Sequence, residues 1–149
     1  MTASSLFNYS DKYLAGIFSS VKSIAVIGAS DNPNKASADV IKLLLEVGYC
    51  VFAVNPRAAN TTIAGAPVFA SLADIPHAVD MVDVFRPSRE LCSIAEQAVA
   101  KGVKVLWTQL EIYDSTAVAI AEAAGLAVVV DRCPKVELPR LGLLPSSGE

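Results

Sequence analysis

The sequence predicts an α/β fold, in which a single doubly wound, mainly parallel five-stranded sheet carries helices on both faces. Three features support this prediction: short apolar runs rich in β-branched residues, helix-period segments between them, and a glycine after each such segment. Continuous apolar runs are typical of parallel strands that are covered on both faces. Strands that alternate with helices over short connections favour right-handed βαβ crossovers.

Five apolar runs are the expected strands, at residues 24–27, 49–54, 79–85, 103–107 and 126–130. Apolar stripes with a three-and-four spacing predict the helices between them, and the stripes consist of Val40, Ile41, Leu44 and Leu45, of Leu91, Ile94, Ala95, Ala98 and Val99, and of Ala117, Ile120, Ala121 and Ala124. Gly48, Gly102 and Gly125 follow these stripes, where a left-handed residue often ends a helix. Ser88 and Asp114 are the expected N-caps of the second and third helices.

The remaining segments are less regular. An additional helix at about residues 11–21 is expected to pack on the sheet. Glycine and prolines make residues 58–76 too irregular for a helix, so we expect this segment to run over the sheet with a short edge strand near Val68. The tail at residues 145–149 is expected to fray.

The composition suits one domain with a sizeable core, since 53% of the 149 residues are hydrophobic. We expect a single domain over residues 1–149, with its core at about 23–141. A net charge of -3 without any run of like charges argues against a nucleic-acid surface. No apolar run approaches the roughly 20 residues that span a bilayer, and residues 1–10 lack signal-peptide features. These features predict a cytoplasmic protein without a membrane partner.

Cysteine and histidine usage gives little material for a disulfide or a metal site. The three cysteines, Cys50, Cys92 and Cys133, are odd in number and widely spaced. His77 follows a proline and is expected in a surface loop, so we expect no metal site. Cys50 is expected in the core, whereas Cys133 lies beside two basic residues and is either a reactive thiol or a packing residue.

The first strand ends in a phosphate-binding candidate. The apolar run breaks at Gly28 into a small polar loop that contains Lys35 and precedes a helix. Backbone N–H groups and the positive helix end would face an anion there, and Lys35 would add a full charge. The loop lacks both G-x-G-x-x-G and G-x-x-x-x-G-K-[ST], so an ordinary βα turn remains the alternative.

Polar residues follow each expected strand at the end where ligands bind in open parallel sheets. These tips are residues 28–30, 55–57, 85–88, 107–109 and 131–135. The second tip reads Asn55-Pro56-Arg57, whereas an NAD-binding domain normally has an acidic residue there. An arginine would bind a ribose phosphate, which favours NADP or coenzyme A over NAD.

Five motifs stand in order along the chain: Val26-Ile27-Gly28-Ala29-Ser30, Val54-Asn55-Pro56, Ile75-Pro76 with residues 79–86, Trp107-Thr108-Gln109, and Asp131-Arg132-Cys133-Pro134-Lys135. Together they resemble the small stand-alone CoA-binding proteins, which are similar to the N-terminal CoA-binding domain of the succinyl-CoA synthetase α subunit. The resemblance covers roughly residues 23–141 and implies a Rossmann-like fold that binds CoA.

The resemblance also implies roles for individual residues. The CoA diphosphate would be held by Gly28, Ala29, Ser30 and Lys35, and the adenosine with its 3′-phosphate would lie by Asn55, Pro56 and Arg57. The nucleotide would be flanked by Arg86 and Pro87. The path of the pantetheine arm would be lined by Trp107 and Gln109. For Trp107, the alternative to a role along the pantetheine path is packing in the core. Cys133 is expected near the thiol end of the bound CoA. The family commonly has a glycine after Trp-x-Gln, but this chain has Leu110-Glu111, where the carboxylate narrows the pocket or points to solvent.

The leading hypothesis is a module that binds CoA or a short acyl-CoA without catalytic residues of its own. Asp80 and Asp83 fall on opposite faces of their strand and so do not form a catalytic pair. His77 lies outside any motif that matches the phosphorylated histidine of succinyl-CoA synthetase. The alternatives are an NADP-binding oxidoreductase-type domain and a non-catalytic partner of a larger enzyme, and a homo-oligomer is compatible with each.

Overall fold

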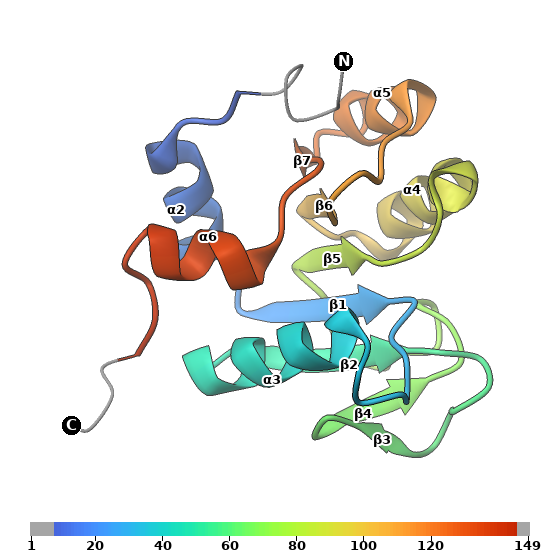
Figure 1. Ribbon diagram of the computed structural model, residues 1–149. Coiled ribbons are helices and arrows are strands. Elements are labelled where there is room, and N and C mark those ends of the chain that lie inside the picture. The colour runs from blue at the N-terminus through green and yellow to red at the C-terminus, as the bar shows by residue number, and fades with distance from the viewer. Residues whose placement is uncertain (1–7, 146–149) are drawn as a thin grey trace.

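Seven strands form one sheet in the computed structural model, which describes residues 8–145 (Figure 1). They are β1 (Ser23–Ile27), β2 (Cys50–Val54), β3 (Thr62–Ile63), β4 (Ala66–Phe69), β5 (Met81–Val84), β6 (Val105–Thr108) and β7 (Ala127–Val129). The strand order is β3-β4-β2-β1-β5-β6-β7, and every neighbouring pair is parallel except β3 with β4. The predicted doubly wound α/β fold is thus confirmed, and each predicted strand overlaps an observed one.

Helices cover both faces of the sheet (Figure 1). They are α2 (Asp11–Ser20), α3 (Ala36–Val47), α4 (Leu91–Lys101), α5 (Ser115–Ala123) and α6 (Pro134–Arg140), with a short 3-10 helix, η1 (Ser88–Glu90), before α4. One apolar core joins the sheet to α2, α3 and α6, through residues such as Leu14, Ile41 and Leu138. The other joins it to α4 and α5, through residues such as Leu91 and Ala117. None of the helices in residues 8–145 is long and apolar enough to cross a bilayer.

A hairpin accounts for the two strands beyond the predicted five. Ala64 and Gly65 both have positive φ angles, +51° and +96°, and connect the paired residues Ile63 and Ala66. A two-residue hairpin turn with two positive φ angles matches the right-handed twist of the strands. β4 contains Val68 and pairs with β2, so the expected short strand near Val68 is present, but it is not the edge, because β3 pairs with its other side. The partner strand β3 was not predicted, because Ala-Gly lacks the usual Asn-Gly or Asp-Gly signal.

Most predicted helix ends are confirmed, with one exception. Left-handed Gly48 and Gly102 end α3 and α4. Asp114 caps α5, and its Oδ1 accepts a hydrogen bond from the Ala117 N–H at 2.9 Å. The N-cap assigned to Ser88 was wrong, because η1 intervenes before α4 and the Ser88 hydroxyl accepts instead from the Tyr113 N–H at 2.9 Å.

Three further differences concern burial and the C-terminal region. Cys50 is exposed rather than in the core, because it is the first residue of β2 and lies where the strand leaves the covered part of the sheet. Ala124, expected on a buried helix face, is exposed beyond the end of α5. The chain after β7 forms α6, which begins at Pro134, a residue favoured in the first turn of a helix. Residues 146–149 of the predicted frayed tail lie outside the described residues.

Two tyrosines cover the outer side of the last strand, β7. The Tyr13 hydroxyl donates to the Val128 carbonyl at 3.2 Å, and the Val130 N–H donates to the Tyr9 hydroxyl at 2.9 Å. The two rings stack with their centroids 5.7 Å apart. Backbone groups that would otherwise face outward at this sheet edge therefore have side-chain partners.

Candidate functional site

A groove of about 710 Å³, which we term the carboxyl-end groove, opens where β1, β2 and β5 end. The chain runs from β1 toward β2 on one side and later toward β5 on the other, so the strand order reverses here. Ligands of doubly wound sheets bind in the crevice at such a reversal. Seven of the predicted site residues line the groove: Gly28, Ala29, Ser30, Asn55, Pro56, Arg57 and Arg86.

The side chain of Asn55 joins two of the loops that form this groove. Its Nδ2 donates to the Ala29 carbonyl at 2.9 Å, and its Oδ1 accepts from the Arg57 N–H at 2.8 Å. The loop after β1 is held further where the Ser30 N–H donates to the hydroxyl of Ser37 in the first turn of α3, at 3.0 Å. One amide thus fixes the loop after β1 relative to the loop that carries Arg57.

Gly28 makes room for an arginine. Its φ is +86°, and a Cβ atom there would lie 2.7 Å from Cδ and 3.0 Å from Cγ of Arg86. Its N–H donates to the Val54 carbonyl at 3.2 Å and so continues the pairing with β2. Any larger residue would displace the Arg86 stem and strain the backbone.

The two arginines of the groove are held differently. The Arg86 guanidinium donates from Nε to Oε1 of Glu90 at 3.1 Å and from Nη2 to Oε2 of Glu90 at 2.7 Å. The hydrogen bond from Arg86 lowers the pKa of Glu90, so this carboxylate is charged at neutral pH. Within residues 8–145, Arg57 forms no salt bridge, and its side chain is exposed.

Five of the predicted residues lie outside the lining of the groove: Lys35, Pro87, Trp107, Gln109 and Cys133. Lys35 is exposed at the N-cap of α3 and makes no side-chain capping bond. Pro87 is exposed and precedes η1. Trp107 is fully buried, packs against Phe18 with ring centroids 5.0 Å apart, and donates from Nε1 to the Arg132 carbonyl at 2.9 Å. These contacts match the core-packing alternative for Trp107.

The end of β7 is more enclosed than the sequence implied. Cys133 is 8% exposed and packs in the core beneath α2, α3 and α6. Its basic neighbours are engaged elsewhere, since Arg132 lies over the Tyr9 ring and Lys135 pairs with Asp39 at 3.3 Å. Neither contact directs a positive charge at the thiol.

The loop after β6 contains the residue that replaces the family glycine. Glu111 has a φ of +65°, a left-handed conformation that glycine adopts without strain. Its N–H donates to Oδ1 of Asp131, which also has a positive φ, +60°. Glu111 is exposed, which favours the alternative in which its carboxylate points to solvent. The neighbouring Gln109 is buried, and its Oε1 has no hydrogen-bond partner among residues 8–145.

Asp83 is the most unusual carboxyl group of the described chain. It is fully buried in the middle of β5, opposite Val26 and Trp107, and neither carboxyl oxygen has a hydrogen-bond partner in the described part of the chain. Burial raises the pKa of the Asp83 carboxyl group well above its ordinary value, because the low-dielectric interior disfavours the charged form. Asp80, by contrast, accepts from the Lys22 N–H at 2.8 Å at the start of β1. As expected, the two do not form a pair.

Several lining residues were not predicted: Ala70 and Ser71 after β4, and Glu90, Ile94 and Gln97 from η1 and α4. Glu90 had a weak sequence signal, since it is an acidic residue four positions after Arg86, although Arg86 itself precedes η1. The others carry no local signal, since they reach the groove through the position of the hairpin and of α4.

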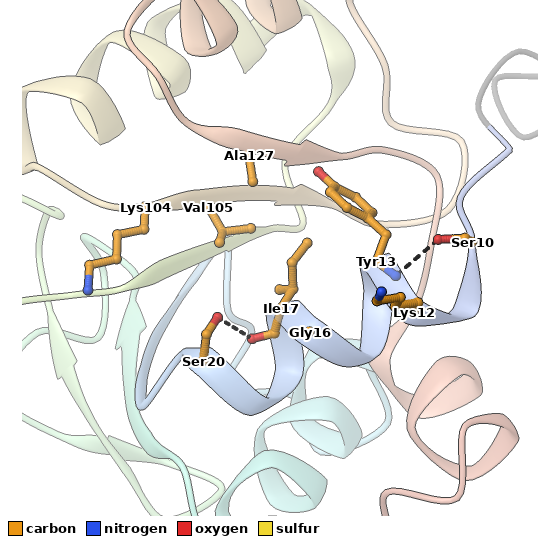
Figure 2. Close-up of a pocket in the computed structure, with 9 residues that line it drawn as sticks. All are labelled: Ser10, Lys12, Tyr13, Gly16, Ile17, Ser20, Lys104, Val105 and Ala127. Carbon is orange, nitrogen blue, oxygen red and sulfur yellow. Dashed lines mark hydrogen bonds between the residues drawn. The ribbon is translucent and has the colours of Figure 1, made fainter.

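A second groove, of about 540 Å³, lies at the opposite ends of the strands (Figure 2). This amino-end groove runs between α2 and the first residues of β6 and β7, Val105 and Ala127. Lys12 and Lys104 supply its positive charges. None of the residues predicted for ligand binding lines it.

Comparison with known proteins covers both the sheet and the carboxyl-end groove. A family model described as "CoA binding domain" matches residues 22–139. The uncharacterized protein YneT of Bacillus subtilis is 34% identical over 115 residues, which span 77% of this chain and 84% of that protein. A hypothetical protein from Pyrococcus horikoshii OT3 superposes with a TM-score of 0.84 at 36% identity, over 90% of this chain and 93% of that chain.

A larger protein matches over a smaller share of its length. The alpha subunit of ADP-forming acetate–CoA ligase I from Pyrococcus furiosus is 37% identical over 89 residues. These residues span 57% of this chain and 19% of that subunit. The similarity therefore concerns one part of the ligase subunit.

Proposed function

This chain belongs to the CoA binding domain family, and from that membership we propose that it binds coenzyme A or a short acyl-CoA reversibly in the carboxyl-end groove. The observation that carries the proposal is the convergence of seven expected residues on one groove at the reversal of strand order. They come from three separate loops, and only the fold brings them together.

Arg57 distinguishes the nucleotide. Its exposed guanidinium lies in the groove without a salt bridge to any residue of the described chain, so it is available to a ligand phosphate. CoA carries such a phosphate on the 3′ position of its ribose. We assign Arg57 to this phosphate, with Asn55 and Pro56 beside the adenosine.

The remaining roles follow the groove from the adenosine toward the thiol. Ala29 and Ser30 in the loop after β1, with Lys35 at the start of α3, are assigned to the diphosphate. Arg86 and Pro87 flank the nucleotide. Gln109 and Cys133 follow β6 and β7, further along the same end of the sheet, and are assigned to the pantetheine side.

We propose a binding role without catalysis. The part of the Pyrococcus furiosus ligase subunit that resembles this chain is 19% of that subunit, so the resemblance extends to one module of a larger enzyme. A non-catalytic partner of such an enzyme is compatible with the same groove. An NADP-binding domain is the competing function, because an arginine at the position of Arg57 would also bind the ribose phosphate of NADP.

Calorimetric titration with CoA, dephospho-CoA, NADP and NAD tests the proposal. We expect CoA to bind most tightly and dephospho-CoA to lose about tenfold or more, because a charge-assisted contact to the 3′-phosphate contributes about 1.5–3 kcal/mol. If NADP binds more tightly than CoA, the NADP-binding function is favoured over CoA binding. Equal or tighter binding of NAD would contradict the role of Arg57 altogether.

A further inference from the structure

The carboxyl-end groove contains a side-chain carboxylate, that of Glu90, which is paired with one of the two arginines of the groove. Arg86 and Glu90 both line the groove, and they meet through two hydrogen bonds, of 3.1 and 2.7 Å. Two oxygens of one anion that accept from two nitrogens of one guanidinium also describe the usual contact of arginine with phosphate. Glu90 therefore offers Arg86 the same kind of partner that a ligand phosphate would offer.

The bound position of Arg86 also covers the start of the loop after β1. Its Cγ and Cδ atoms lie where a Cβ atom of Gly28 would project, at 3.0 and 2.7 Å. This loop is the proposed place of the CoA diphosphate. A diphosphate that approaches Gly28 meets the Arg86 stem first, with the guanidinium turned toward Glu90.

We propose that Glu90 is an internal competitor of the ligand: its carboxylate occupies the Arg86 guanidinium in the empty groove, and a ligand phosphate displaces it. This inference rests on the proposed function and adds a residue that sets affinity and specificity. A ligand gains from Arg86 only if its anion outcompetes a carboxylate that is already in place. The groove consequently selects for phosphate groups near Gly28 and against ligands that carry a single carboxylate there.

The exposure of the pair makes this exchange favourable. The side chains of Arg86 and Glu90 are 47% and 37% exposed, and ion pairs in such positions are weak because water solvates both partners. The diphosphate of CoA carries two negative charges over its two phosphates and forms charge-assisted, bidentate hydrogen bonds with the same guanidinium. Arg57, which has no carboxylate partner in the described chain, requires no exchange.

The opposite role for Glu90 would be to position Arg86 for the ligand. The two roles predict opposite signs when the charge of Glu90 is removed while its shape is kept. A competitor that is neutralised leaves a tighter ligand complex, whereas a lost positioning contact leaves a weaker one. Glu90→Gln therefore distinguishes them directly.

The experiment is a double-mutant cycle on CoA affinity, measured by calorimetry with the full chain. We expect Glu90→Gln to tighten CoA binding about two- to fivefold, which is the range that corresponds to an exposed ion pair. In the Arg86→Ala background the same substitution should have no effect, because no guanidinium remains for Glu90 to occupy. Glu96→Gln, on the exposed side of α4 and outside the groove lining, is the control for net charge.

Each outcome decides the inference. A gain that persists in Arg86→Ala, or that Glu96→Gln reproduces, overturns it in favour of general charge repulsion. Unchanged or weaker binding in Glu90→Gln overturns it in favour of positioning.

Inorganic pyrophosphate separates the inference from the proposed function, because it is an anion of the same class without the nucleotide. If CoA does not bind but pyrophosphate binds more tightly to Glu90→Gln, and only when Arg86 is present, the competitor role stands without the CoA assignment. If CoA binds and neither ligand responds to Glu90→Gln, the competitor role fails alone. Failure of both ligands to bind any variant overturns both.

Discussion

The carboxyl-end groove and the amino-end groove lie at opposite ends of the same strands, and they differ in how their polar groups are arranged. Their volumes are similar, about 710 and 540 Å³, and each contains two basic side chains. In the amino-end groove, Lys104 is paired with Asp80 at 3.9 Å and the Tyr13 hydroxyl is used by the β7 backbone. In the carboxyl-end groove, loops from several strands converge and Asn55 links two of them.

The difference follows from the direction of the strands. Parallel strands all end at the same side of the sheet, so the loops that follow them meet there and present their side chains to one another. The amino ends of most strands receive the chain from helices, and there α2 runs beside the first residues of β6 and β7 (Figure 2). Volume alone therefore does not identify the binding site of this fold.

Asp83 lies on β5, an inner strand of the sheet, and lines neither groove, so its substitution should change stability without changing CoA binding. Its pKa is raised in the folded state, so the folded chain retains a proton that the unfolded chain loses above a pKa of about 3.9. The stability contribution is complete below that pH and falls by about 1.4 kcal/mol per pH unit as the pH rises toward the folded pKa. We expect the wild type to lose stability relative to Asp83→Asn as the pH rises above about 4.

Urea unfolding of both proteins at several pH values measures this difference. CoA affinity at a fixed pH should be the same within about twofold, because Asp83 does not line the carboxyl-end groove. Parallel pH profiles for the two proteins would show that Asp83 is ionised in the fold with a partner outside the described contacts.

Substitution of one basic residue in each groove tests which of the two grooves binds CoA. We expect Arg57→Ala to weaken CoA binding about tenfold or more, through loss of the contact with the 3′-phosphate. Lys104→Ala, the matched change in the amino-end groove, should leave the affinity unchanged. Calorimetry should also show no effect of Arg57→Ala on dephospho-CoA, and an equal loss for both ligands would assign Arg57 to another part of the nucleotide.

Lys35 tests how far the carboxyl-end groove extends. It lies outside the lining but begins α3, next to the loop assigned to the diphosphate. We expect Lys35→Ala to weaken CoA binding about three- to tenfold and to leave the melting temperature of the free protein within about two degrees. An unchanged CoA affinity would indicate that the loop is an ordinary connection between β1 and α3 and does not bind the diphosphate.

The cysteines give the smallest and slowest expected effect. Cys50 is exposed where β2 begins, whereas Cys133 is 8% exposed after the end of β7. We expect a general thiol reagent to modify Cys50 first. In a Cys50→Ser background, CoA disulfide should instead modify Cys133, because binding in the carboxyl-end groove brings the disulfide sulfurs toward the end of β7. The Cys133 thiolate then attacks the disulfide and releases one CoA thiolate.

Intact mass should then show one CoA adduct that is absent after Cys133→Ser and retained after Cys92→Ser. Reaction with glutathione disulfide at the same rate would indicate simple accessibility. Absence of any adduct while CoA binds would make Cys133 a packing residue.

The fold was largely predictable because its signals are local. Apolar runs, helical stripes and terminal glycines each depend on neighbours within one element, and they located every major strand and the helices α2 to α5. The hairpin of β3 was missed because the left-handed conformation of Ala64 is imposed by pairing with β4. Cys50 was misplaced because a strand pattern does not tell where the helices stop covering it.

Most of the predicted residues that line the groove come from two loops, each of which carries three of them. Gly28 to Ser30 and Asn55 to Arg57 could be recognised as units, and both line the groove. Ile94 and Gln97 reach it through the packing of α4, which no sequence pattern describes. Gly28 lines the groove as expected, but the space it leaves is filled by the Arg86 side chain, a contact between two loops that are distant in sequence.

The two tyrosines on β7 have a consequence for self-association. At one margin of the sheet, the hydroxyls of Tyr9 and Tyr13 occupy backbone groups that an added strand would need. At the other margin, β3 presents only two paired residues, Thr62 and Ile63, which is too short a template for a stable new strand. The sheet is thus closed to growth at both margins, so concentrated solutions of this chain should resist fibril formation, and any dimer it forms should meet through helices or loops.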